Sequence, residues 1–222
     1  MNATRPQRYE LIVFDWDGTL FDSTALIVQA IQGAAADLGL PVPPRERAAH
    51  VIGLGLYEAL AIATPELPRE RYAEMGQAYR RHYFAQHDAL CLFGGVEALL
   101  QALKARHHWL AIATGKSRSG LDEALRHVAL QGVFDASRTA DETQSKPHPL
   151  MLEQLMREFA VEPERTLMIG DTTHDLQLAR NAGCAALGVS YGAHDPEHFE
   201  DFEPVHIAHS VPDLHDWLLK HA

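Results

Sequence analysis

The chain has 222 residues, of which 46% are hydrophobic and 22% charged, the ordinary balance of a globular protein. Its 19 Lys and Arg residues against 30 Asp and Glu residues give a formal net charge of −11 at pH 7. So acidic a chain lacks the positive field that nucleic-acid binding needs, and we expect no nucleic acid among its partners. The two cysteines form no Cys-x-x-Cys pair, which excludes a disulfide framework.

The N-terminal segment has no apolar core of the kind that a signal peptide needs. The longest apolar runs, such as Leu11–Phe14 and Trp109–Ala113, have the length of strands rather than of membrane spans. We therefore expect a protein of the reducing cytoplasm that does not contact a membrane.

Strand-like and helix-like patterns alternate along most of the chain. Apolar runs that end in Gly, Asp, Thr or Ser cover Leu11–Phe14, Trp109–Ala113, Thr166–Ile169 and Ala185–Val189. Apolar positions at helical spacing cover Val96–His107, Ser119–Leu130, Leu150–Phe159 and Asp175–Ala182. This alternation predicts an α/β fold, a doubly wound, Rossmann-like parallel sheet whose functional side chains lie beyond the carboxyl ends of the strands.

One interval, from residue 22 to residue 88, carries no strand-like run. Helices are expected there near Ser23–Leu38, Arg45–Ile52, Leu56–Ala63 and Arg69–Gln86. We predict that residues 22–88 form an all-helical cap domain inserted into an α/β core made of residues 1–21 and 89–222.

Two carboxylates follow the first predicted strand, in the run Asp15-Trp16-Asp17-Gly18-Thr19. In an extended chain the side chains of Asp15 and Asp17 point to the same side, and their mutual repulsion favours a bound cation. Mg²⁺ suits such an oxygen-rich site, especially beside a phosphate group. Gly18 allows a sharp turn that brings backbone N–H groups near a bound anion.

Further polar groups end the later strands. Thr114 and Gly115 offer a hydroxyl and a backbone N–H for phosphate oxygens, and Lys146, one of four lysines, lies in a loop that Pro147 restricts. Asp171 and Asp175 are four residues apart and therefore share one face of a starting helix. Taken alone, such acids are also typical of a helix N-terminus.

These groups occur together in one order: Asp15–Thr19, Thr114, Lys146 and Gly170–Asp175. The ordered set resembles the four motifs of the haloacid dehalogenase superfamily, in its helical-cap, phosphoglycolate phosphatase-like branch. The resemblance implies that Asp15 is a nucleophile that becomes an aspartyl phosphate, and that Asp17 is the general acid and base. Thr114 and Lys146 would then hold and neutralise the phosphoryl oxygens.

The same resemblance implies Mg²⁺ as the cofactor. Asp15, Asp171 and the backbone carbonyl of Asp17 would be its ligands. Asp175 would be either a ligand through water or a residue that orients Lys146. The implied activity is a Mg²⁺-dependent phosphatase acting on a small phosphorylated metabolite.

Residues at a few positions argue against other activities. A dehalogenase lacks an acid at the position of Asp17, and a phosphonatase needs a cap lysine, which residues 22–88 do not contain. The run Gly115-Lys116-Ser117 ends like a P-loop, but Leu110 occupies the position of the required first glycine. A sugar-phosphate mutase of the same superfamily and, less favoured, a non-enzymatic receiver-like phosphoacceptor stay as alternatives.

The cap and the histidines give further predictions. Gly53, Leu54 and Gly55 form the predicted substrate-specificity loop, which carries no Arg or Lys for a substrate carboxylate. Of the 14 histidines, the His194/His198 pair is expected in a solvated loop. Met151, Met156 and Trp109 are expected in the core. The sequence leaves open whether the protein is a monomer or a dimer.

Overall fold

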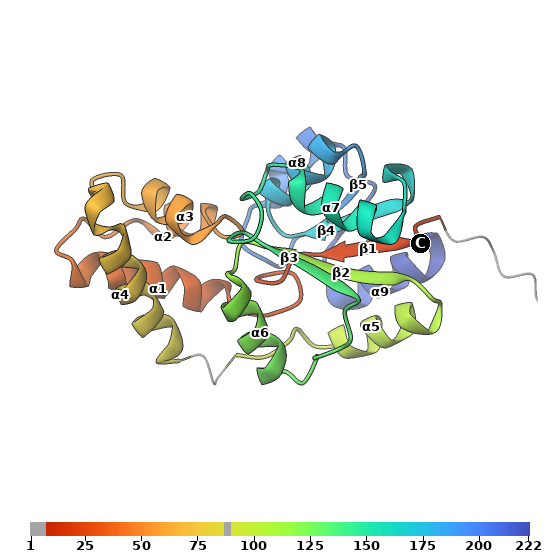
Figure 1. Ribbon diagram of the computed structural model, residues 1–222, viewed down its shortest axis with the longest axis horizontal. Coiled ribbons are helices and arrows are strands. Elements are labelled where there is room, and N and C mark those ends of the chain that lie inside the picture. The colour runs from red at the N-terminus through yellow and green to blue at the C-terminus, as the bar shows by residue number, and fades with distance from the viewer. Residues whose placement is uncertain (1–7, 87–89) are drawn as a thin grey trace, which may run out of the picture.

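A computed structural model describes residues 8–86 and 90–222 of the chain (Figure 1). Six parallel strands form one sheet in the order β3-β2-β1-β4-β5-β6. The strands are β1 (Leu11–Phe14), β2 (Trp109–Thr114), β3 (Ala136–Thr139), β4 (Thr166–Gly170), β5 (Ala185–Val189) and β6 (Ile207–Ala208). The predicted doubly wound α/β fold is confirmed, although the edge strands β3 and β6 were not among the predicted strands.

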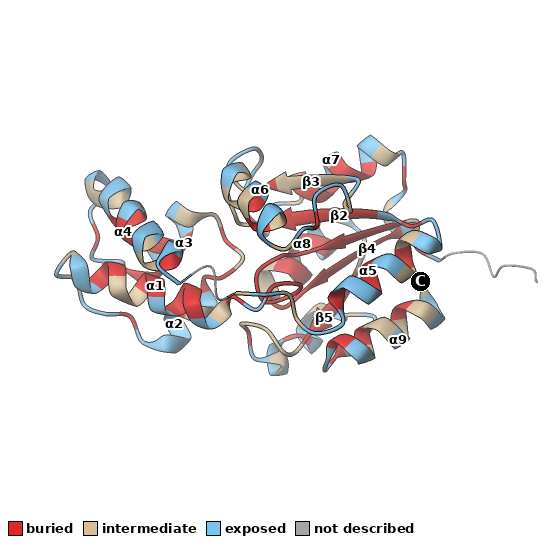
Figure 2. Cartoon of the chain, turned by 90° about the horizontal axis from the view of Figure 1, so that it is seen from below, coloured by how far each residue is buried: buried red, intermediate tan, exposed pale blue. Residues whose placement is uncertain are grey.

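Helices cover both faces of the sheet (Figure 1). One face packs against α5 (Val96–Ala105), α6 (Arg118–His127) and α9 (Val211–His221), and the other against α7 (Leu150–Phe159) and α8 (Thr173–Ala182). Strand side chains alternate between the two layers, so Ile12 and Phe14 enter the first core while Leu11 and Val13 enter the second. Because both faces are covered, the central strands are buried along their length (Figure 2).

Four helices follow β1 and pack on one another beyond the carboxyl end of the sheet (Figure 1). They are α1 (Thr24–Asp37), α2 (Arg45–His50), α3 (Leu56–Ala63) and α4 (Tyr72–Phe84). The helix expected over Arg69–Gln86 is instead a 3₁₀ turn, Arg69–Arg71, followed by α4. The bundle has apolar cores of its own, made by residues such as Ile31 and Leu60.

Two chain segments connect this bundle to the sheet, and they lie side by side. The Phe93 N–H donates to the Leu20 carbonyl at 3.0 Å, and the Asp22 N–H donates to the Cys91 carbonyl at 3.0 Å. The two connections are therefore joined by backbone hydrogen bonds, and the start of the cap at residue 22 stays a prediction. The predicted second boundary, between residues 88 and 89, lies outside the described residues.

The predicted burial of three large apolar side chains is confirmed for two of them. Met151 and Met156 are buried, as predicted. The prediction for Trp109 is wrong, because its side chain is 45% exposed at the start of β2, where it stacks on Phe159 with ring centroids 5.0 Å apart. None of the described helices combines the length and the apolar character that crossing a membrane requires.

Candidate active site

The predicted site residues come from the carboxyl ends of neighbouring strands. Asp15 follows β1, Thr114 ends β2, and Asp171 follows β4, while Lys146 lies in the loop between β3 and α7. Because β1 pairs with both β2 and β4, these strand ends meet at one edge of the sheet. The side chains of Asp15, Thr114, Lys146 and Asp171 are all buried there.

Lys146 joins two of the carboxylates. Its Nζ donates to Asp15 Oδ1 at 2.6 Å and to Asp175 Oδ1 at 2.7 Å, and none of the three side chains is more than 1% exposed. Burial disfavours the ammonium form, yet the two carboxylates raise the pKa of Lys146 above its usual value. Lys146 is thus a fixed positive charge against the predicted nucleophile.

Asp175 also closes the first turn of α8. Its Oδ2 accepts from the Thr172 N–H at 3.1 Å while its own N–H donates to the Thr172 hydroxyl at 3.3 Å, and this reciprocal pair is a capping box. The Thr172 hydroxyl also donates to Oδ2 at 2.7 Å. In the structure this carboxylate caps the helix and contacts Lys146, and its predicted roles toward the metal and the lysine stay predictions. Its position on α8 gives Lys146 a second carboxylate contact besides Asp15.

Asp171 is held by two donors from distant parts of the chain. Its Oδ1 accepts from the Thr19 hydroxyl at 2.8 Å and its Oδ2 from the Ala193 N–H at 2.7 Å. Burial and the adjacent Asp175 raise the pKa of Asp171 to about 7. Neither donor was identified from the sequence, because both interactions depend on how the loops after β1 and β5 fold over β4.

The carboxylates fit a hard divalent cation. Asp15, Asp171 and Asp175 bring possible ligand oxygens within 4.8 Å of one another, the one such group found among the described residues. The single ammonium of Lys146 cannot balance three carboxylates, and burial raises the pKa of Asp15 well above its ordinary value. Asp15 Oδ2 is buried and accepts no hydrogen bond from the described residues. A bound cation would satisfy this oxygen and the excess negative charge.

Asp17 lies outside that cluster and has partners of its own. Its Oδ1 accepts from the Ser23 hydroxyl at 2.6 Å, and its Oδ2 lies 3.1 Å from Lys116 Nζ. Lys116 in turn donates to the Tyr83 hydroxyl on α4 at 3.2 Å. Sequence reasoning missed Ser23 and Lys116, although the position of Lys116, two residues after Thr114, is a signal that could have revealed it.

Two glycines permit close approaches at the site. Gly18 has φ +84°, and a Cβ there would lie 2.2 Å from Asp171 Oδ2. The Gly18 N–H donates to the Phe21 carbonyl at 2.8 Å and so closes a turn, while the predicted phosphate contact at Gly18 stays a prediction. At Gly115 a Cβ would lie 2.3 Å from the Leu54 carbonyl oxygen, so this glycine admits the loop before α3.

The predicted specificity loop contacts the sheet domain at two points. Besides the approach of Leu54 to Gly115, the Gly55 N–H donates to the Ser145 hydroxyl at 2.9 Å. Ser145 immediately precedes Lys146, so the helical bundle touches the segment that carries the buried lysine. Thr114 and Gly115 keep their predicted phosphate contacts as predictions; in the structure the Thr114 hydroxyl accepts from the Lys116 N–H at 3.2 Å.

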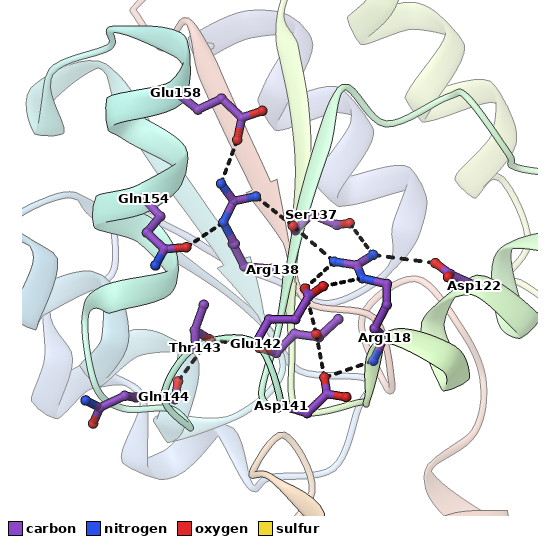
Figure 3. Close-up of polar contacts among 11 residues, drawn as sticks. Arg118, Asp122, Ser137, Arg138, Asp141, Glu142, Thr143, Gln144, Gln154 and Glu158 are labelled. Carbon is purple, nitrogen blue, oxygen red and sulfur yellow. Dashed lines mark hydrogen bonds and ion pairs between the residues drawn. The ribbon is translucent and has the colours of Figure 1, made fainter.

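A network of ion pairs holds the loop that leads to Lys146 (Figure 3). Arg118 at the start of α6 contacts both carboxylate oxygens of Glu142, at 3.0 and 2.6 Å, and donates to the Ser137 hydroxyl at 2.8 Å. The Arg118 N–H also donates to Asp141 at 2.9 Å. The network therefore ties α6 and β3 to the residues that precede the buried lysine.

The expectation of a solvated loop is wrong for His194, although His198 is exposed. The His194 ring is buried, accepts from the Thr173 N–H at 3.1 Å and lies 3.0 Å from the His50 carbonyl. It stacks on the His50 ring of α2 with centroids 5.0 Å apart. The reason for the difference is tertiary: the helical bundle covers this loop, and burial lowers the pKa of His194 to about 4.

Comparison with known proteins identifies the class. Residues 12–189 match the family described as haloacid dehalogenase-like hydrolase, so the chain belongs to that family, as its four motifs predicted. A solved haloacid dehalogenase-like hydrolase from Streptococcus pneumoniae superposes with a TM-score of 0.80 at 26% identity, covering 95% of this chain and 98% of that one.

Several similar proteins are named as phosphatases. The chain is 36% identical to "Probable phosphatase IndB" of Dickeya dadantii, covering 92% of this chain and 91% of that protein. It is 31% identical to a phosphoglycolate phosphatase of Vibrio vulnificus, covering 96% and 97%. A 5'-nucleotidase of Pseudomonas aeruginosa is 32% identical, again covering 96% and 97%. The likeness to phosphoglycolate phosphatases that the motifs predicted is confirmed.

Proposed function

We propose that this hydrolase is a Mg²⁺-dependent phosphatase that acts on a small phosphorylated metabolite through an aspartyl phosphate on Asp15. Its family and its phosphatase-named relatives support hydrolysis of phosphoric monoesters. One structural observation carries the mechanism: Asp15 is buried, with one oxygen fixed by Lys146 and the other unpartnered among the described residues. With the unpartnered oxygen on the cation, the oxygen beside Lys146 would bond to phosphorus.

Asp15 and Asp17 have different roles in the formation and the hydrolysis of the aspartyl phosphate. Asp15 attacks phosphorus, and the bond from phosphorus to the leaving alcohol breaks. Asp17 gives its proton to that alcohol and later takes a proton from the water that attacks the aspartyl phosphate. The Ser23 and Lys116 contacts hold the Asp17 carboxylate in place for both transfers.

Lys146 and Thr114 are the proposed partners of the phosphoryl oxygens, whose negative charge is redistributed during phosphoryl transfer. A carboxylate repels a phosphate dianion unless positive charge is placed between them, and Lys146 supplies such charge at the nucleophile. Gly18 and Gly115 are the proposed backbone positions at the phosphoryl group, and their missing side chains allow Asp171 and the loop before α3 to come close. Asp15, Asp171 and the Asp17 carbonyl would hold Mg²⁺, with Asp175 oriented toward Lys146. The ion, when bound, would neutralise phosphoryl oxygens.

The helical bundle is the proposed cap, residues 22–88, and its loop Gly53–Gly55 is the proposed specificity segment. Its contacts with Gly115 and Ser145 support this assignment. We place the reaction in the cytoplasm, consistent with the free thiols of Cys91 and Cys184. Membership of a hydrolase family argues against a receiver-like phosphoacceptor. A sugar-phosphate mutase would differ in the acceptor of the phosphoryl group. It would transfer the group from Asp15 to a sugar hydroxyl, whereas a phosphatase transfers it to water.

The experiment measures inorganic phosphate released from a panel of phosphorylated metabolites, with Mg²⁺ and after its removal by EDTA. We expect release that requires the metal and is abolished in Asp15→Asn while the melting temperature is retained. Asn keeps the shape but loses the nucleophile. Substantial turnover by folded Asp15→Asn would refute the nucleophile, and transfer to a second sugar position without phosphate release would establish the mutase.

A further inference from the structure

A cavity of about 550 Å³ lies between the helical bundle and the sheet, and Asp17 is part of its lining. Its walls come from α1, α3 and α4 on one side and from the loops after β2 and β3 on the other. This volume falls in the range of sites that enclose a whole small molecule. The cavity therefore begins where the proposed acid meets the leaving group.

The bundle side of the cavity is apolar and aromatic. Ile27 and Ile31 of α1 and Leu54 before α3 line it, all nearly fully buried. Tyr79 and Tyr83 of α4 add two stacked rings with centroids 5.9 Å apart. Flat rings and branched aliphatic side chains favour a flat apolar ligand over a hydrated one.

The charges in the lining do not favour a second anionic group on the substrate. Its described cations are Lys116 and Arg80, against the acids Asp17, Glu58 and Asp141. Lys116 already faces Asp17 at 3.1 Å and Tyr83 at 3.2 Å. A substrate carboxylate or second phosphate would therefore enter a region without surplus positive charge. A glycolate-sized leaving group would also leave most of the volume unfilled.

We propose that this cavity receives the leaving group and selects phosphate monoesters whose alcohol bears a flat apolar ring over esters of small hydroxy acids. The inference rests on the proposed phosphatase function and names the substrate class for the same site. The ring would lie among Ile27, Leu54, Tyr79 and Tyr83, with the ester oxygen toward Asp17.

The first test compares 2-phenylethyl phosphate with ethyl phosphate and phosphoglycolate. The two alkyl esters have leaving groups of similar basicity, so their difference reports the ring rather than the chemistry. We expect kcat/KM for the phenylethyl ester to exceed that for the ethyl ester by about 30-fold, the effect of burying one phenyl ring. Equal values, or a preference for phosphoglycolate, would overturn the proposal while leaving the phosphatase function intact.

The second test fills the cavity. Leu56 lines it from α3, and Leu56→Trp should lower kcat/KM for the phenylethyl ester at least 10-fold while changing that for ethyl phosphate less than twofold. Ile62 on the same helix is 44% exposed and does not line the cavity, so Ile62→Trp is the matched control. Ala59→Leu, a smaller change in the same wall, replaces Leu56→Trp if that variant unfolds.

A binding measurement separates failure of the cavity from failure of the phosphatase function. Saturation-transfer NMR with 2-phenylethanol should show ring contact in wild type and Ile62→Trp and a weaker signal in Leu56→Trp. No contact in wild type would overturn the cavity assignment, whatever esters are hydrolysed. Contact that Leu56→Trp weakens, in a protein that hydrolyses no ester, would support the cavity and refute the proposed reaction.

Discussion

The two sides of the interface between sheet and helical bundle differ in chemistry. The sheet side contributes buried charges, such as Asp15, Lys146 and Asp171, each held by a short polar contact. The bundle side contributes mainly apolar and aromatic groups, with Tyr83 as the partner of Lys116. Charged groups whose positions must be precise lie at the rigid ends of parallel strands, while the groups that select a ligand lie on helices. Changes on the sheet side should therefore affect every substrate, and changes on the bundle side should alter their ranking.

The strongest test of the sheet side is Lys146→Ala. Removing this ammonium leaves Asp15 and Asp175 without their common partner, and we expect kcat to fall by about 10³-fold or more on all substrates. Phosphate release measures the loss, and circular dichroism verifies the fold. Lys104→Ala removes the partially exposed pair with Asp135 and is the control, expected to retain activity. Near-normal turnover in Lys146→Ala would show that the charge has no part in catalysis.

Asp17→Asn distinguishes the two acids of the first motif. We expect phosphorylation by ordinary esters to slow by about 10²–10⁴-fold, because the alkoxide leaves without a proton. An activated donor such as acetyl phosphate should still phosphorylate Asp15, and the phosphoenzyme should persist because water lacks its base. Mass spectrometry after mixing detects the phosphoenzyme, with Asp15→Asn as the variant that cannot form it. Equal phosphoenzyme lifetimes in wild type and Asp17→Asn would contradict the role of Asp17 as base.

Gly115→Ala tests how closely the two sides must approach. The new Cβ would lie 2.3 Å from the Leu54 carbonyl and 2.5 Å from that of Gly53, so the loop before α3 has to move. We expect kcat/KM for 2-phenylethyl phosphate to fall by about tenfold, with a smaller loss on ethyl phosphate. At Gly94 a Cβ meets nothing within 4 Å, so Gly94→Ala is the matched control. A uniform loss on all substrates would place Gly115 with the phosphate contacts instead.

The network around Arg118 predicts an effect on stability. Arg118→Ala removes the two contacts to Glu142 and the one to the Ser137 hydroxyl, and we expect the free energy of unfolding to fall by about 1 kcal/mol. Urea unfolding measures it. Arg71→Ala removes a similar two-point contact to Glu74 that stands alone on the surface, and its loss should be smaller. Equal losses of unfolding free energy in Arg118→Ala and Arg71→Ala would show that the network stabilises the protein no more than an isolated ion pair does.

The sequence supported the prediction of the sheet and the strand-end groups because both depend on local patterns. Continuous apolar runs identify buried parallel strands, and polar residues at their ends must meet at one edge. The partners across the interface could not be predicted in this way. Lys116 meets Tyr83, and His194 meets His50, only because the bundle folds back over the sheet. The two-residue strand β6 is too short to leave a periodic pattern.

The smallest expected effect lies far from this interface, at His108. Its ring is 2% exposed, Nδ1 lies 2.9 Å from the Tyr9 carbonyl, and burial lowers the pKa of His108 below its usual value. The unfolded chain therefore binds a proton near pH 6.5 while the folded protein does not, so the free energy of unfolding falls as the pH drops below about 6.5. Above that pH both states are neutral and this contribution is fully present.

His108→Asn should reduce this pH dependence, because the Asn amide can still donate to Tyr9 but does not titrate. We expect the fall in the free energy of unfolding between pH 7 and pH 5 to be about 1 kcal/mol smaller than in wild type. Urea titrations at both pH values measure the difference, which is independent of the other buried histidines. The exposed neighbour His107, at φ +66°, tolerates Asn and gives the control, His107→Asn. If both variants keep the wild-type slope, His108 takes up its proton in the folded protein as readily as in the unfolded chain.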